Sequence, residues 1–184
     1  MKKMSTKKMV ILAMLTAMSF VLAATIRFPL LPQAPFIKYS PSDIPIVIGG
    51  LIFGPFSAFL IALASALLEG ITVGTSGIIG IIMNIVSKTS FAVIISLIYK
   101  KFATNKGLIF ALIIGSIVNL ISMVLLNIAL TPIYTGQAVE KVIAMILPII
   151  IPTNLIKLAI NSVVSFAIFK SIFKFIKEGN YDKA

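Results

Sequence analysis

Long apolar runs, separated by short polar or proline-containing segments, constrain this chain more than any other feature. Hydrophobic residues make up 59% of its 184 residues and charged residues only 11%, and the mean hydropathy is +1.13. A soluble domain of this length cannot hide so much apolar surface in one small core. The sequence therefore predicts an all-α integral membrane protein and excludes a soluble enzyme or a free nucleic-acid-binding protein.

The apolar runs predict six transmembrane helices within a single transmembrane domain, 1–184. Segment 27–42 contains four prolines, too many for a helix interior, and is expected to form an ordered outer loop. Gly54-Pro55 breaks the following run into a hairpin or a broken pair, because its first ten residues rise only about 15 Å. The expected spans are about 9–26, 43–54, 55–71, 77–99, 107–131 and 152–173, with an amphipathic interfacial helix at about 137–147.

The distribution of cations predicts which ends of the chain face the cytoplasm. The formal net charge is +11, and most of the cations cluster between the apolar runs. The expected inner segments hold Lys2, Lys3, Lys7, Lys8, Lys100, Lys101, Lys106, Lys170, Lys174, Lys177 and Lys183, and the outer segments hold Arg27, Lys38 and Lys141. This positive-inside bias predicts cytoplasmic N- and C-termini and an even number of spans.

The residue types that are missing from the sequence limit the reactions that this chain can catalyse. The chain has no cysteine, no histidine and only five carboxylates. Disulfides, thiolate nucleophiles and cysteine-based metal sites are therefore excluded, and the commonest general base and metal ligand is absent. No catalytic residue, metal site or cofactor is predicted. The composition favours a binding or transporter subunit, and an intramembrane enzyme is the least favoured alternative.

Polar side chains inside the spans are the candidates for function, because they are costly in lipid. Asn154 and Lys157 lie three residues apart and share one face near the outer start of the last span. Together they can bind the carbonyls or hydroxyls of a polar ligand, and a Lys that extends to the headgroups is the equally weighted alternative. Asn127, near the outer end of the fifth span, can bind a heteroaromatic ring edge or join two helices by a hydrogen bond.

Five further polar residues in or beside the spans have simpler interpretations. Asn84 and Asn161 can each bind a ligand or hold helices together, and the second interpretation is favoured, but Asn84 is kept among the candidate ligand-binding residues. Asp43 is expected to be a helix N-cap. Glu69 is expected to be solvated or paired with a loop cation. Lys88 lies mid-span with no obvious carboxylate at a matching depth, so it is expected to border an inward cavity or a partner subunit.

Three segments of the chain, taken in order, resemble one family. They are IKYSPSDIPIVIGGLIFGP (37–55), NIALTPIY (127–134) and IIPTNLIKLAINSVVSFAIFK (150–170). They are similar to segments of the substrate-binding S components of energy-coupling factor (ECF) vitamin transporters, and most closely of the riboflavin-specific subfamily. The resemblance extends over about 9–173. It implies six helices and a vitamin bound near the outer face of a bacterial plasma membrane.

The resemblance also implies roles for particular residues. In the subfamily, the Asn of the fifth-span motif and the Asn and Lys of the sixth-span motif contact the flavin, and these fall on Asn127, Asn154 and Lys157. The family's A-x-x-x-A surface on the first helix, which docks on the transmembrane coupling subunit, falls on Ala13 and Ala17. Small residues at this spacing let another helix approach closely, although alanine is common in spans.

The implied function is high-affinity capture of riboflavin, with FMN as a further candidate ligand. Energy would come from two ABC-type ATPase subunits through the coupling subunit, because this sequence contains no phosphate-binding loop. Tyr39 and Tyr134 are candidates for stacking on the ring of the ligand.

Some features differ from the riboflavin subfamily. Segment 61–70 has only apolar or small residues before Glu69, where the riboflavin proteins carry polar ones. Lys88 stands where a small residue is expected, and the segment between the fifth and sixth spans is short. The alternatives are an S component for thiamine, pantothenate or a pyrimidine, and a non-transporting scaffold whose buried Asn and Lys only hold helices together.

Overall fold

Helices dominate the computed structural model, which describes residues 4–32, 37–74 and 77–178, except for the side chains of Tyr134 and residues 173–178. The elements in chain order are α1 (Thr6–Thr25), β1 (Phe28–Pro29), β2 (Lys38–Tyr39), α2 (Asp43–Phe53), α3 (Pro55–Thr72), α4 (Gly77–Lys101), α5 (Asn105–Thr135), α6 (Val139–Met145), the π-helical turn η1 (Ile146–Ile150) and α7 (Ile151–Glu178). Strands β1 and β2 pair antiparallel and form a short hairpin in the proline-containing loop.

Local sequence signals explain where several helices begin and end. Ser5 and Thr104 cap α1 and α5, and the side chain of each accepts a hydrogen bond from the amide three residues later. Gly54 separates α2 from α3 with a φ of +90°, which residues with a Cβ rarely adopt. Pro55 then opens α3 at a position where no amide donor is needed. The short helix and the longer one are therefore a broken pair.

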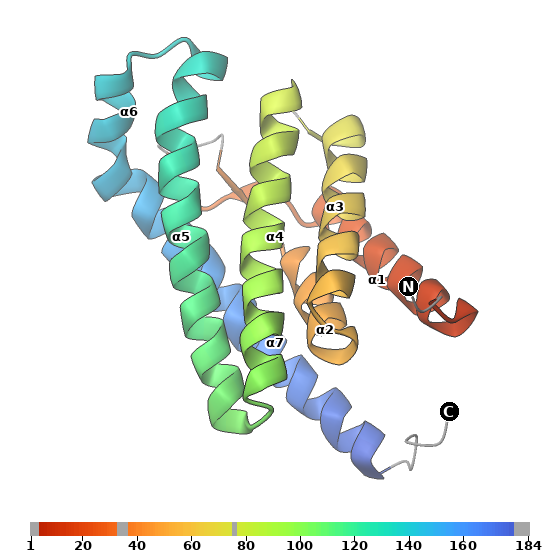
Figure 1. Cartoon of the computed structure of the whole chain (residues 1–184). Coiled ribbons are helices and arrows are strands. Elements are labelled where there is room, and N and C mark those ends of the chain that lie inside the picture. Colours follow the sequence, from red (N-terminus) through yellow and green to blue (C-terminus); the bar gives the residue numbers. More distant parts are fainter. Residues whose placement is uncertain (1–3, 33–36, 75–76, 179–184) are drawn as a thin grey trace.

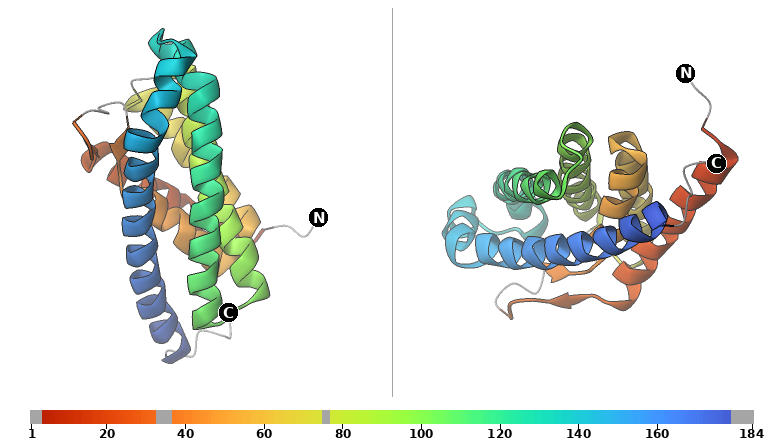
Figure 2. Two further views of the ribbon diagram at one scale, coloured as in Figure 1. Left: turned by 90° about the vertical axis from the view of Figure 1, so that its left-hand side faces the viewer. Right: turned by 90° about the horizontal axis from the view of Figure 1, so that it is seen from below.

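The helices are arranged around α2. Helices α3, α4 and α5 stand side by side in one row, and α7 runs across the other face of the bundle (Figure 1, Figure 2). Helix α2 lies between these layers and packs on α1, α3, α4 and α7. Its residues from Asp43 to Leu51 are all buried. A helix that is covered on every side must be apolar all round, which explains why this run has no polar face.

The apolar core lies where α2 meets the row of longer helices. Ile46 of α2 and Ile95 of α4 are fully buried there. Gly50 allows this close approach, because a Cβ at that position would collide with Ser96 Oγ and lie 2.8 Å from the Cβ of Ala58. The absence of a side chain at Gly50 thus sets the distance between α2 and its two neighbours.

Apolar side chains also cover the outside of the bundle. Phe56, Ile78, Leu125 and Val163 are between 61% and 77% exposed. Among the described residues, five helical segments are long and apolar enough to cross a membrane, namely Thr6–Thr25, Pro55–Thr72, Gly77–Lys101, Asn105–Ile133 and Val139–Ile172. An outer surface of this kind fits lipid as its solvent. The prediction of an all-helical membrane protein is confirmed, while the orientation of its termini stays a prediction.

The segment before the last span continues directly into it. Helix α6, the turn η1 and α7 follow one another without a break from Val139 to Glu178. Of the apolar residues whose spacing predicts an amphipathic helix at 137–147, Val142 is buried, whereas Ile143 and Leu147 are exposed. A position at the membrane interface stays a prediction for this segment.

Replacing Gly50 with alanine is expected to destabilise the fold by about 1–3 kcal/mol, because overpacking forces α2 away from α3 and α4. Ala64→Val is the matched control, since it adds methyl groups on the exposed face of α3. Thermal unfolding of both variants in detergent measures the effect. An unchanged midpoint for Gly50→Ala would contradict the close packing.

Candidate ligand-binding site

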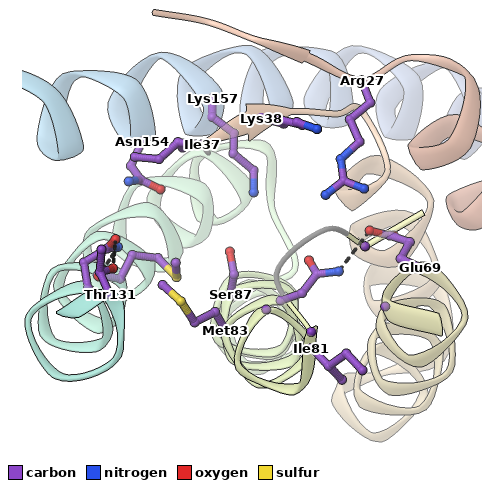
Figure 3. A pocket seen from close by; sticks show the side chains of 17 residues that line it. Arg27, Ile37, Lys38, Glu69, Ile81, Met83, Ser87, Thr131, Asn154 and Lys157 are labelled. Atoms are coloured by element: carbon purple, nitrogen blue, oxygen red, sulfur yellow. Dashed lines mark hydrogen bonds between the residues drawn. The ribbon is translucent and has the colours of Figure 1, made fainter. Parts of the chain in front are cut away.

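A cavity lies at the end of the bundle where α3 and α5 end and where α4 and α7 begin (Figure 3). Its lining comes from these four helices and from the loop that contains the β-hairpin. The residues are Arg27, Ile37, Lys38, Glu69, Gly70, Gly74, Gly77, Gly80, Ile81, Met83, Asn84, Ser87, Met123, Asn127, Thr131, Asn154 and Lys157. The lysine-rich connection between α4 and α5 lies at the opposite end of those helices.

Two asparagines form one polar wall of this cavity, and both are 3% exposed. Asn127 Nδ2 donates to the carbonyl oxygen of Met123 at 2.7 Å, and its Oδ1 accepts from Thr131 Oγ1 at 2.9 Å. Asn154 Nδ2 donates to the carbonyl oxygen of Ile150 at 2.8 Å. These bonds orient each amide, and because each nitrogen carries two hydrogens, one further donor remains on each for a ligand. All of these bonds stay within the asparagine's own helix or the turn that leads into it.

A second polar wall lies across the cavity, formed by α3 and α4. Asn84 Nδ2 donates to Glu69 Oε2 at 2.9 Å, which is the dashed contact beside Glu69 in Figure 3. Glu69 is only 6% exposed. Met83 and Ser87 of α4 lie between the two walls. The site therefore combines separated polar groups with a polarisable methionine side chain and a serine hydroxyl between them.

Lys88 lies behind the cavity and is 2% exposed. Its Nζ donates to Glu69 Oε1 at 2.5 Å and to Ser42 Oγ at 2.7 Å, and it lies 3.9 Å from Asp43 Oδ1. An ammonium group without partners would be strongly destabilising at this position. Two carboxylates from different helices supply the opposite charge.

Asp43 connects this ion pair to the far side of the cavity. Its Oδ2 lies 3.5 Å from Lys157 Nζ and accepts a hydrogen bond from Asn161 Nδ2 at 2.9 Å. Four helices each contribute one charged residue: Glu69 from α3, Lys88 from α4, Asp43 from α2 and Lys157 from α7. We call these four residues the four-charge network. Its two ammonium groups balance its two carboxylates, so the cluster carries no net charge inside the bundle.

Tyr39 of β2 is the second hydrogen-bonding partner of Asn161, beside Asp43. Its hydroxyl donates to Asn161 Oδ1 at 3.3 Å, and its ring lies 5.5 Å from that of Phe28, measured between centroids. Burial, with a further contribution from the negative charge of Asp43, raises the pKa of Tyr39 above its ordinary value of 10.0. The phenol therefore stays protonated and remains a donor at physiological pH.

The expectations for three charged residues are wrong. Lys88 does have carboxylates at its own depth, because α2 and α3 bring Asp43 and Glu69 to it. Glu69 is buried and pairs within the bundle instead of with a loop cation. Ser42, and not Asp43, is the N-cap residue of α2, and the carboxylate of Asp43 faces other helices. Spacing along one helix carries no information about the depth of residues on another.

The structure brings together most of the residues predicted to bind a ligand. Those that line the cavity are Asn84, Asn127, Asn154 and Lys157. Tyr39 is 7% exposed and is not part of the lining. Tyr134 lies in α5, but its side chain falls outside the described residues. Ala13 and Ala17 are exposed on α1 and do not line the cavity. Contact of any of these residues with a ligand or partner stays a prediction.

Sequence reasoning missed part of the lining. Arg27 and Lys38 reach the cavity from the loop, and Arg27 Nη1 donates to the carbonyl oxygen of Val73 at 2.8 Å, which ties the loop to the end of α3. The glycine-rich stretch 70–80 was the available signal, since four of its glycines line the cavity. Within the described residues, no group of three or more Asp, Glu, His or Cys side chains is placed to hold a metal ion.

Comparison with known proteins identifies the family. Residues 7–169 match the family model described as "ECF transporter, substrate-specific component". The chain belongs to this family. A solved structure of the S component of a bacterial ECF transporter agrees with this assignment, with a TM-score of 0.81 and 31% identity over 93% of this chain and 98% of that one.

Several curated proteins are similar over part of the chain. Riboflavin transporter FmnP of Bacillus subtilis is 32% identical over 113 residues, which is 60% of this chain and 58% of that protein. Riboflavin transporter RibU of Streptococcus thermophilus is 36% identical over 107 residues, 57% of this chain and 50% of that protein. RibU of Lactococcus lactis subsp. cremoris is 37% identical over 99 residues, 52% and 48% of the two chains. The chain thus spans about half the length of the curated relatives it matches.

These findings confirm the predicted family and the predicted class of protein. Members of the family are substrate-binding components of transporters and not enzymes. The family and the apolar helices together place the chain in a bacterial plasma membrane as a multi-pass protein.

Replacing Asp43 with asparagine leaves Lys88 and Lys157 with one carboxylate between them. Removing one partner from a buried ion pair costs about 3–5 kcal/mol, so a large fall in the unfolding midpoint is expected. Glu140→Gln is the control, because Glu140 is an exposed carboxylate on α6 and its loss should change little. Thermal unfolding in detergent measures both, and equal midpoints would contradict the structural role of the network.

Proposed function

We propose that this S component binds riboflavin with high affinity at the outer face of the membrane. It would deliver the vitamin inward together with a transmembrane coupling subunit and two ABC-type ATPase subunits. The observation that carries the proposal is the bonding of Asn127 and Asn154, whose hydrogen bonds are local to their own helices while the amides face a cavity. Amides that served only as a scaffold would bond between helices.

The chemistry of the cavity matches a flavin. The pyrimidine edge of a flavin ring alternates carbonyl acceptors with an imide N–H donor, and an amide side chain supplies both a donor and an acceptor. Lys157 adds an ammonium donor on the same wall. The rest of the ring is apolar and aromatic, and Met83 and Met123 offer soft surfaces for it. The similarity to three riboflavin transporters supports the same ligand.

FMN is a second candidate ligand for the same cavity. Arg27 and Lys38 line it on the loop side. Among the described residues, Glu69 is the only carboxylate in the lining. Cationic side chains in such a position can pair with a phosphate group on the end of the ligand chain.

The charge distribution supports the proposed orientation. Lys100, Lys101 and Lys106 lie at the end of α4 and the start of α5, opposite the cavity. Under the positive-inside rule this end is cytoplasmic, so the cavity opens towards the outside. The lysines near both ends of the sequence favour cytoplasmic termini by the same rule.

Riboflavin is expected to bind stoichiometrically to the purified protein, with quenching of its fluorescence. Asn127→Ala and Asn154→Ala should each weaken binding about tenfold, the effect of losing one or two ligand hydrogen bonds. Asn119→Ala is the matched control, because this buried asparagine bonds to Ser87 and Ser90 on α4 and does not line the cavity.

Two results would contradict this part of the proposal. Equal weakening in all three asparagine variants would show that the losses reflect general damage to the fold. An absence of quenching by folded wild-type protein would contradict riboflavin as the ligand but not the family. Thermal shift with thiamine, pantothenate and pyrimidines would then identify the ligand.

The exposed small residues of α1 are proposed as the contact with the coupling subunit. The double variant Ala13→Leu/Ala17→Leu should lose most riboflavin uptake when co-expressed with an ECF module in a riboflavin auxotroph, because bulky side chains keep the partner helix away. Its riboflavin affinity in detergent should not change. Met18→Leu, at an exposed neighbour on α1, conserves volume and should leave both quantities unchanged. Normal uptake by the double variant would contradict this assignment.

A further inference from the structure

Lys88 does not line the cavity, yet it is joined to both of its polar walls. It bonds directly to Glu69 on one wall, and through Asp43 it is linked to Lys157 on the other. The two ends of the four-charge network therefore face the cavity, while its two middle members lie behind it. Such an arrangement allows Lys88, which does not line the cavity, to fix the positions of Glu69 and Lys157, which do.

The bonding of Glu69 leaves it able to accept further hydrogen bonds. Lys88 occupies Oε1, and Asn84 occupies Oε2. An ionised carboxylate has about four acceptor sites, so about two remain unoccupied on a residue that lines the cavity. It has no donor of its own. A carboxylate in this setting can pair only with the O–H or N–H groups of a ligand.

The end of the cavity opposite Glu69 is suited to the ring system of a flavin. Asn127 and Asn154 offer donors and acceptors to a heteroaromatic edge, which leaves the wall of Glu69 for the opposite part of the ligand. In riboflavin that part is the ribityl chain, whose hydroxyl groups are donors.

We propose that Lys88 is a positioning residue for ligand selection. It supplies the opposite charge that keeps the Glu69 carboxylate fixed as an acceptor for the hydroxyl groups of the ligand. The site thereby favours a flavin with a polyhydroxy chain over the bare ring system. This inference rests on the proposed riboflavin function.

A purely structural role for the pair is the competing explanation, and a double variant separates the two. Lys88→Met alone leaves a buried carboxylate without its partner and is expected to lower stability strongly. Glu69→Gln/Lys88→Met removes both charges, keeps the side chains close in size and leaves the contact between Asp43 and Lys157 in place. The double variant should therefore fold, and the amide that replaces the Glu69 carboxylate would offer a weaker, neutral acceptor.

The test compares riboflavin with lumiflavin, which has the same ring system but a methyl group in place of the ribityl chain. Both are titrated by fluorescence into wild-type protein, the double variant and Lys100→Met, an exposed lysine at the end of the same helix. The double variant should lose about tenfold or more in riboflavin affinity, because a charged acceptor is replaced by a weaker, neutral one, and change about twofold or less for lumiflavin. Lys100→Met should match the wild type for both ligands.

The outcomes distinguish this inference from the proposed function. Normal riboflavin affinity and normal preference over lumiflavin in the double variant would overturn the role of Lys88 and leave the proposed function standing. An equal loss for both ligands would overturn it too, because a positioning role predicts a loss for riboflavin alone. A wild-type protein that binds no riboflavin would overturn the proposed function and this inference together.

Discussion

A buried ammonium group deep inside an apolar bundle is the constraint on which the rest of this structure depends. Lys88 requires opposite charge within a few ångströms, because an isolated ion in apolar surroundings costs several kcal/mol even after relaxation. Glu69 and Asp43 supply that charge from α3 and α2, and Asp43 extends the contact to Lys157 of α7. Four helices are thereby brought to one depth. Because Glu69 and Lys157 also line the cavity, the same requirement determines where its two polar walls stand.

The cavity and the network divide the polar residues of the spans into two groups. Lys88, Asp43 and Asn161 bond between helices or to the hairpin, so their contacts explain how the bundle is held together. Asn127 and Asn154 bond only locally along their own helices and present the remaining amide groups to the cavity. The S-component fold does not determine a ligand. The flavin proposal therefore depends on this second group of residues and on the similarity to riboflavin transporters.

Periodicity and composition were sufficient to predict the helices and four of the polar residues that line the cavity, Asn84 among them. Apolar runs indicate spans because lipid is the solvent, and Asn127, Asn154 and Lys157 stood out as polar groups within them. The pairing of Lys88 was beyond such reasoning, since its partners lie 19 and 45 positions earlier in the chain on other helices. The unbroken passage from α6 to α7 was also missed. A π-helical turn that contains Pro148 joins the two segments there.

A structure determined with riboflavin bound tests the account most directly. The account predicts the flavin ring against Asn127 and Asn154, its hydroxyl chain within hydrogen-bonding distance of Glu69, and Lys88 still in contact with the Glu69 carboxylate. A flavin bound outside this cavity would contradict the central claim. So would a flavin in the cavity whose hydroxyl groups point away from a Glu69 that has separated from Lys88.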